Sequence, residues 1–367
     1  MQVEHPVTEM VVKQDLVEWQ LKVASGNGLP LRQDELQLHG HAMEARIYAE
    51  NPNSDFLPGT GALAHLSTPM PSENVRIDTG VRQGDEVSVF YDPMIAKLIV
   101  WDQDREAAIR RLHNSLSDYN IVGLHTNIKF MQKVLNHSAF KAGKVDTNFI
   151  DNYKKELLPP QVSVPGKHVA ATVLQLLLRE REAVAGANSP WDTLQGRNIS
   201  GPGQREFKFL DNEQEVTAVA TYEADGTFVV AVGEESFAVS GFLDGDTVRA
   251  TVNGRTSTVK VVRHKNEYHI FADDDSFELA VPVPAYDEAQ VEKGSLMSPM
   301  PGRMIQVRVK EGDRVAEGDC LMIMEAMKME HKIIATSSGV VTAVAYKEGD
   351  LVEEKKVLVV IADDEAE

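Results

Sequence analysis

The spacing of apolar residues divides the chain into regions of different periodicity. Over the first 150 residues helix and strand patterns alternate. Residues 16–24 and 104–116 place apolar side chains three or four positions apart, whereas residues 41–50 alternate apolar and polar side chains. These periods are typical of amphipathic helices and half-buried strands, respectively. The pattern predicts a mixed region of helices and strands over residues 1–150.

A second region follows the prolines at 159, 160 and 165. One strongly apolar helix is expected over residues 168–181. Short β-type runs separated by Asp-Gly and Asn-Gly pairs then fill residues 205–281. Such pairs between alternating runs are the strongest short-range signal of β-hairpins. We expect a domain over residues 160–282 that combines the helix with about eight strands in an antiparallel barrel or sandwich.

The last region, residues 299–363, contains an internal repeat. The sequence KEGDRV at 310–315 recurs 37 residues later as KEGDLV at 347–352, and Gly302 recurs as Gly339. Each half is too small to bury a β-face alone, so the two halves should pack face to face about a pseudo-twofold axis. We predict a small, flattened all-β barrel. The polar, proline-bearing segment 283–298 before it is expected to be a mobile linker.

Composition and charge exclude several classes of function. The chain has 37 basic and 56 acidic residues and a net charge of −19, so it repels phosphate backbones and nucleic acid is not an expected partner. No apolar run approaches the roughly 18 residues that span a bilayer, and the N-terminus does not resemble a secretory signal. The single cysteine, Cys320, excludes an intramolecular disulfide and an all-cysteine zinc site, and no metal site is expected.

The sequence EAMKME at 325–330 lies between the two repeats, where a hairpin turn would expose Lys328. It resembles the attachment motif of biotin carboxyl carrier domains, in which biotin is joined to the central lysine. The resemblance makes Lys328, with Met327 and Met329 beside it, the covalent biotin site. An exposed lysine, with a pKa of about 10.4, has no catalytic role of its own, so it serves as a tether.

Two other interpretations of Lys328 remain. The ordinary interpretation is a solvated turn. Two features argue against it: Lys328 lies between the two repeats, and the sequence SPMPG at 298–302 also resembles the biotin carrier family. The other is a lipoyl carrier, which shares this fold. Lipoyl lysines usually follow aspartate and lack the paired methionines, so the sequence favours biotin.

Three motifs near the N-terminus resemble biotin carboxylases of the ATP-grasp superfamily: QVEHPVTE at 2–9, HAMEARI at 41–47 and YDPMIAK at 91–97. The resemblance implies that residues 1–150 form a partial biotin carboxylase C-terminal domain within a multidomain α+β chain. In that family, ATP and magnesium sites precede this signature. We therefore expect this chain to be a truncated or excised C-terminal piece that does not bind ATP or carboxylate biotin alone.

The same resemblance assigns roles to four residues. It implies that Glu4 is the base that deprotonates bicarbonate and that Gln2 and Val3 help to hold bicarbonate. It implies that Arg46 stabilises the enolate that develops on biotin. A fixed guanidinium aimed at a developing oxyanion gives such stabilisation without reorganisation. Without the resemblance, Glu4 and Arg46 would be interpreted as ordinary surface or ion-paired residues.

The sequences at 119–128, 143–150 and 329–331 narrow the resemblance to the α subunits of methylcrotonoyl-CoA carboxylase, an enzyme of leucine breakdown. The resemblance implies that residues 160–282 dock onto a carboxyltransferase β subunit and that a biotin protein ligase modifies the carrier. The carrier would then bring carboxybiotin to the β subunit. The resemblance also implies a location in the mitochondrial matrix, or in the cytoplasm if the protein is bacterial.

Alternatives remain open. They are an α subunit of propionyl- or geranyl-CoA carboxylase, and a carrier and docking module without catalysis.

Overall fold

A computed structural model describes residues 1–88, 90–160, 162–184, 197–198, 201–212, 214–282, 295–326, 329–353 and 356–363. Residues 159–285 form a compact unit distinct from the rest of the chain.

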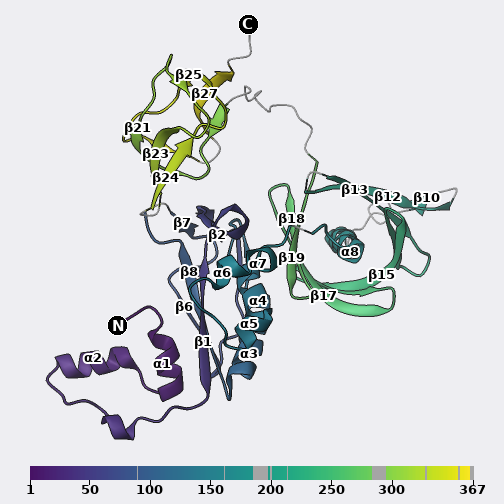
Figure 1. Ribbon diagram of the computed structural model, residues 1–367. Coiled ribbons are helices and arrows are strands. Elements are labelled where there is room, and N and C mark those ends of the chain that lie inside the picture. Colours follow the sequence, from purple (N-terminus) through teal and green to yellow (C-terminus); the bar gives the residue numbers. More distant parts are fainter. Residues whose placement is uncertain are drawn as a thin grey trace. The chain divides into compact units, whose positions relative to one another are not determined.

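The N-terminal part is built on a three-stranded antiparallel sheet in the order β1–β8–β6, with α3 packed on β1 and β8 (Figure 1). Asp104 caps α3 by accepting a hydrogen bond from the backbone of Ala107 at 2.8 Å. The apolar face predicted for this helix is buried against Ala45 and Ile47 of β1. The main elements are α1 (His5–Val12), α2 (Leu16–Ala24), β1 (His41–Tyr48), β6 (Val75–Thr79), β8 (Met94–Asp102), α3 (Arg105–Ser117) and α4 (Ile128–Asn136).

Shorter elements complete this part. They are η1 (Gln33–Glu35), β2 (Glu50–Asn51), η2 (Pro52–Ser54), β3 (Leu57–Pro58), β4 (Gly61–Ala62), β5 (His65–Ser67), β7 (Glu86–Val87), β9 (Asn120–Val122), α5 (Ser138–Lys141), α6 (Phe149–Asn152) and α7 (Lys154–Leu157). Because side chains alternate along β1, the residues next to Ala45 and Ile47 lie on the other face of the sheet. Helix α1, which contacts β1 and β8, covers that second face.

The compact unit is a closed barrel of eight antiparallel strands, β12 to β19 in chain order, with helix α8 (Gly166–Ala183) inside the ring of strands (Figure 1). The predicted helix and the predicted number of strands are confirmed. Of the two predicted arrangements, barrel or sandwich, the structure shows the barrel. Asn253 and Gly254 have left-handed backbones, φ 48° and 79°, in the turn between β16 and β17. The strands are β10 (Arg197–Asn198), β11 (Gly201–Pro202), β12 (Gln204–Asp211), β13 (Gln214–Tyr222), β14 (Phe228–Val232), β15 (Glu235–Asp244), β16 (Thr247–Val252), β17 (Arg255–His264), β18 (Glu267–Ala272) and β19 (Asp275–Ala280).

The C-terminal part consists of two four-stranded sheets, in the orders β20–β27–β25–β22 and β24–β23–β21–β26. The bounds of β21, β22 and β23 recur 37 residues later in β25, β26 and β27, so the predicted repeat is structural. Each sheet contains strands from both halves, so the halves interleave. The strands are β20 (Ser295–Met297), β21 (Gly302–Val307), β22 (Arg314–Val315), β23 (Cys320–Ala326), β24 (Met329–Ile334), β25 (Gly339–Val344), β26 (Leu351–Val352) and β27 (Val357–Asp363).

The expected linker at 283–298 needs a correction at its C-terminal end. Residues 295–297 form β20, which pairs with β27, and Ser298 is 1% exposed. These four residues belong to the C-terminal β fold, because their backbone is tied to its last strand and the Ser298 side chain is enclosed by it. Residues 283–294 of the predicted linker lie outside the described residues.

Candidate functional site

Glu4 and Arg46, 42 residues apart in sequence, form an ion pair in the N-terminal part. Arg46 lies on β1 and donates from Nη2 to Glu4 Oε2 at 2.8 Å. Glu4 immediately precedes α1, the helix that covers this face of the sheet. Both side chains remain partly exposed, 39% for Arg46 and 52% for Glu4. The two charged residues singled out from the sequence are therefore adjacent and accessible to a small ligand.

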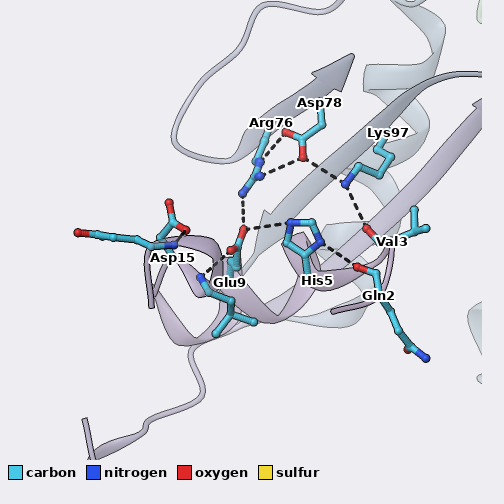
Figure 2. A network of polar contacts seen from close by, with 10 residues as sticks. Gln2, Val3, His5, Glu9, Asp15, Arg76, Asp78 and Lys97 are labelled. Atoms are coloured by element: carbon cyan, nitrogen blue, oxygen red, sulfur yellow. Dashed lines mark hydrogen bonds and ion pairs between the residues drawn. The ribbon is translucent and has the colours of Figure 1, made fainter. Parts of the chain in front are cut away.

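The segment that carries Glu4 is fixed through its backbone. Lys97 on β8 donates from Nζ to the carbonyl oxygen of Val3 at 3.1 Å, and His5 Nδ1 lies 2.9 Å from the carbonyl oxygen of Gln2 (Figure 2). Both contacts are made to backbone carbonyl oxygens, of Val3 and Gln2, so neither involves the side chain of Gln2. Lys97 belongs to a motif of the sequence analysis, but its role could not be read from the sequence.

Glu9 anchors α1 to the sheet. Its residue is 6% exposed, and its carboxylate accepts hydrogen bonds from Arg76 Nη1 at 2.7 Å and from the backbone of Leu16 at 2.8 Å (Figure 2). Arg76 also donates to Asp78, which pairs with Lys97 at 3.3 Å. A chain of alternating charges thus connects the helix after Glu4 to the lysine that holds Val3.

The environment changes the ionisation of this network. Burial alone would raise the pKa of Asp78, but the hydrogen bonds and charges of Arg76 and Lys97 outweigh it, so the pKa is below its ordinary value. The pKa of Arg76 is raised, chiefly by its hydrogen bond to Asp78. Both groups therefore remain charged at neutral pH, and their ion pair is maintained.

A third carboxylate, Glu44, lies two residues before Arg46 on β1. Its side chain is 5% exposed, and the nearest charged atom is Arg46 Nε at 3.7 Å. Burial raises the pKa of the Glu44 carboxyl, and the charges of Lys97 and Arg46 offset this only in part. Sequence reasoning did not single out Glu44. Its place in an alternating strand, on the same face as Arg46, is the signal that could have done so.

The second candidate site is the hairpin of β23 and β24. The ladder between these strands pairs Glu325 with Glu330 and ends with Ala326 paired to Met329. Met327 and Lys328 stand between these two ends and lie outside the described residues. Buried side chains of β23, Met322 and Met324 among them, anchor the strand in the core of the C-terminal part. Strand β23, which directly precedes Met327 and Lys328 in the sequence, is thus firmly packed in that core.

Among the described residues there is no group of three or more His, Cys, Asp or Glu side chains arranged to hold a metal ion. None of the helices described is long and apolar enough to cross a bilayer.

Three protein-family models match successive parts of the chain. Residues 44–152 match the biotin carboxylase C-terminal domain. Residues 165–283 match the BT domain of the methylcrotonyl-CoA carboxylase alpha-subunit, and residues 294–361 match the biotin-requiring enzyme family. The matches follow the three parts of the fold. Arg46 and Lys328 lie inside them, and Glu4 lies before the first.

Individual relatives cover nearly the whole chain. The mitochondrial methylcrotonoyl-CoA carboxylase subunit alpha of Dictyostelium discoideum is 46% identical over 98% of this chain and 54% of its own length. The corresponding rat protein is 44% identical, over 95% of this chain and 51% of its own length. A mitochondrial propionyl-CoA carboxylase alpha chain of Caenorhabditis briggsae is 33% identical, over 91% and 48%. The chain thus spans about half the length of the curated relatives that it matches.

Proposed function

We propose that this chain, a homologue of methylcrotonoyl-CoA carboxylase α subunits over nearly its whole length, carries biotin on Lys328 and works in the carboxylation of 3-methylcrotonoyl-CoA. The observation that carries the proposal is the β23–β24 hairpin. Its paired ends bracket the sequence Met327–Lys328, which lies midway between the two copies of the structural repeat and within a match to biotin-requiring enzymes.

The residues around the hairpin suit a covalently attached cofactor. Biotin supplies a ureido nitrogen that accepts and releases a carboxyl group. Lys328 would supply the amine for its amide bond, and the two strands that bracket it are anchored in the core of the C-terminal part. A tether of this kind replaces diffusion by a local search and so raises the effective concentration of the carried group.

The ion pair of Glu4 and Arg46 supports a role in loading the carrier. Glu4 would take the proton of bicarbonate, for which its half-exposed carboxylate is accessible. Gln2 and Val3 would hold the anion beside it, since Lys97 and His5 fix their backbone. Arg46 would stabilise negative charge on the ureido oxygen of biotin. These assignments follow the family resemblance and are consistent with the spacing of the four residues.

The barrel with its internal helix would dock the subunit onto a carboxyltransferase β subunit. The match of residues 165–283 to the BT domain supports this assignment. A biotin protein ligase would be a second, transient partner. The named relatives are mitochondrial, which supports the mitochondrial matrix as the location. The lower identity to the propionyl-CoA carboxylase chain favours methylcrotonoyl-CoA over propionyl-CoA as the substrate.

The first experiment is co-expression of the chain with a biotin protein ligase, followed by intact mass and a streptavidin blot. We expect one biotinyl adduct on the wild type and none on Lys328→Arg. Lys332→Arg, on β24 of the same hairpin, is the matched control and should be modified normally. An unmodified wild type, or a lipoyl adduct, would contradict the assignment.

A second experiment addresses the partner and the substrate. The chain is purified together with a candidate β subunit and an α subunit of full family length, and a panel of acyl-CoA substrates is tested. Preference for 3-methylcrotonoyl-CoA is the expected result. A preference for propionyl- or geranyl-CoA would instead support those alternatives.

A further inference from the structure

Glu44 is a buried carboxylate without a hydrogen-bond partner in the described part of the chain. Both of its oxygen atoms are enclosed and accept no hydrogen bond. A buried polar group without a partner costs free energy, and a buried charge costs more. Such groups persist in folded proteins where they have another role, so the position of Glu44 needs an explanation.

The groups that face Glu44 come from every element packed around it. Arg46 lies beside it on β1, Lys97 on the neighbouring strand β8, Asp78 on β6, and Glu4 next to α1. The nearest is Arg46, whose Nε lies 3.7 Å from Glu44 Oε1, beyond hydrogen-bond range. Meanwhile Arg46 Nη2 donates a hydrogen bond to Glu4 at 2.8 Å. Arg46 thus stands between two carboxylates and is hydrogen-bonded to only one of them.

We propose that Glu44 is the positioning residue for Arg46, and that Arg46 exchanges Glu4 for Glu44 when Glu4 turns to its substrate. This rests on the proposed function, in which Glu4 must leave the ion pair to accept a proton. A guanidinium has donors on several edges in fixed directions, so a small rotation toward Nε brings Glu44 within reach while the other edge is freed. Glu44 then keeps Arg46 in place over the sheet.

Two features of the site favour this exchange over a swing of Arg46 into solvent. Glu44 is held by the strand itself, in register opposite Ile99 of β8, so it cannot follow Glu4 outward. Its buried carboxylate also gains more from a charged hydrogen bond than an exposed one does, because less water competes for it. The empty hydrogen-bonding positions of Glu44 are therefore the ones that a released Arg46 fills first.

The first test needs only this chain and no activity. A crystal structure of Glu4→Ala, which removes the acceptor of Arg46 Nη2, should show the distance from Arg46 Nε to Glu44 falling from 3.7 Å to hydrogen-bond range, about 2.9 Å. If Arg46 instead points to solvent, or the distance is unchanged, the exchange is refuted. Glu44→Gln in the same chain should be at least as stable as the wild type, because it removes a buried charge that lacks a hydrogen bond.

The second test uses an α subunit of full family length. Glu44→Gln should slow ATP-dependent carboxylation of biotin between about tenfold and a hundredfold, through kcat, because Arg46 is misplaced. ATP cleavage that needs bicarbonate but not biotin should stay within about twofold, since Glu44 makes no hydrogen bond to the residues that would hold bicarbonate. Asp102→Asn, which removes an ion pair with Arg111 at the far end of β8, is the matched control and should leave both rates unchanged.

The outcomes separate the inference from the proposed function. A wild type that neither cleaves ATP with bicarbonate nor carboxylates biotin contradicts the proposed function. A working wild type with a Glu44→Gln variant of equal rate contradicts only the exchange. A variant that loses stability and both activities together shows an ordinary structural role and likewise overturns the proposal.

Discussion

Arg76 and Glu9 are 67 residues apart, and the guanidinium of Arg76 donates to the carboxylate of Glu9 at 2.7 Å. Glu9 lies on α1 and Arg76 on β6, so this pair attaches to the sheet the helix that Glu4 precedes. Because Glu9 is buried and Arg76 is partly exposed, the pair is more than a surface ion pair.

Loss of Arg76 should loosen α1. In Arg76→Met, Glu9 keeps the backbone bond from Leu16 but loses its charged partner, and we expect a local destabilisation of about 2 kcal/mol. The measurement is hydrogen exchange of the amides of residues 5–12. Arg110→Met removes the exposed pair with Glu106 on α3 and should cost less than about 0.5 kcal/mol. Unchanged exchange in α1 would show that Arg76 does not hold the helix.

Gln175 should be essential to the seating of α8 in the barrel. Its side-chain amide donates to the carbonyls of Asp246 and Val261 at 2.9 and 2.8 Å, and the residue is 2% exposed. Gln175→Leu removes both hydrogen bonds, although the carbonyl of Asp246 keeps the bond that it accepts from the backbone of Val261, and we expect a loss of about 2 kcal/mol in the stability of residues 159–285. Chemical denaturation of the whole chain, followed by exchange of barrel amides, measures it. Gln214→Leu, an exposed change on β13, is the control and should have little effect.

Acid should destabilise the barrel through His168. Burial lowers the pKa of His168 below its ordinary value, and the charge of Lys167 acts in the same direction. The folded state therefore binds a proton less readily than the unfolded chain, whose histidine pKa is about 6.5. The resulting stability is fully present above that pH and is lost as the pH falls toward the folded pKa.

The check is a comparison of two pH profiles. Barrel stability is measured between pH 7.5 and 5 for the wild type and for His168→Gln, and the difference between the two profiles isolates His168. We expect the wild type to lose stability more steeply below about pH 6.5. Parallel profiles would mean that His168 binds its proton equally well in both states.

Gly339 should tolerate no side chain. A Cβ at this position would lie 2.2 Å from the carbonyl oxygen of Ala362 on the paired strand β27. Gly339→Ala should therefore destabilise the C-terminal part by about 3 kcal/mol, since backbone atoms must move. Gly312→Ala meets nothing within 4 Å but has φ +93°, so it should cost only about 1 kcal/mol. Thermal unfolding of the two variants compares these costs, and equal losses would contradict the steric argument.

Local sequence patterns were sufficient to predict most of the fold. The amphipathic helix at α3, the number of strands in residues 205–281 and the 37-residue repeat all follow from spacings of a few residues. Such signals depend on the period of a helix or strand and on the backbone preferences of turn residues, which neighbouring residues set. The motif around Lys328 is likewise contained in six consecutive residues.

The arrangement of charges around Arg46 could not be predicted from local sequence patterns. The contact between Lys97 and Val3 joins residues 94 positions apart, and the burial of Glu44 depends on the pairing of β1 with β8 and on the covering helix. Likewise, the repeat predicted two halves but not that each sheet contains strands from both. Register and long-range pairing decide these features, because a shift of a single residue turns every side chain of a strand to the opposite face.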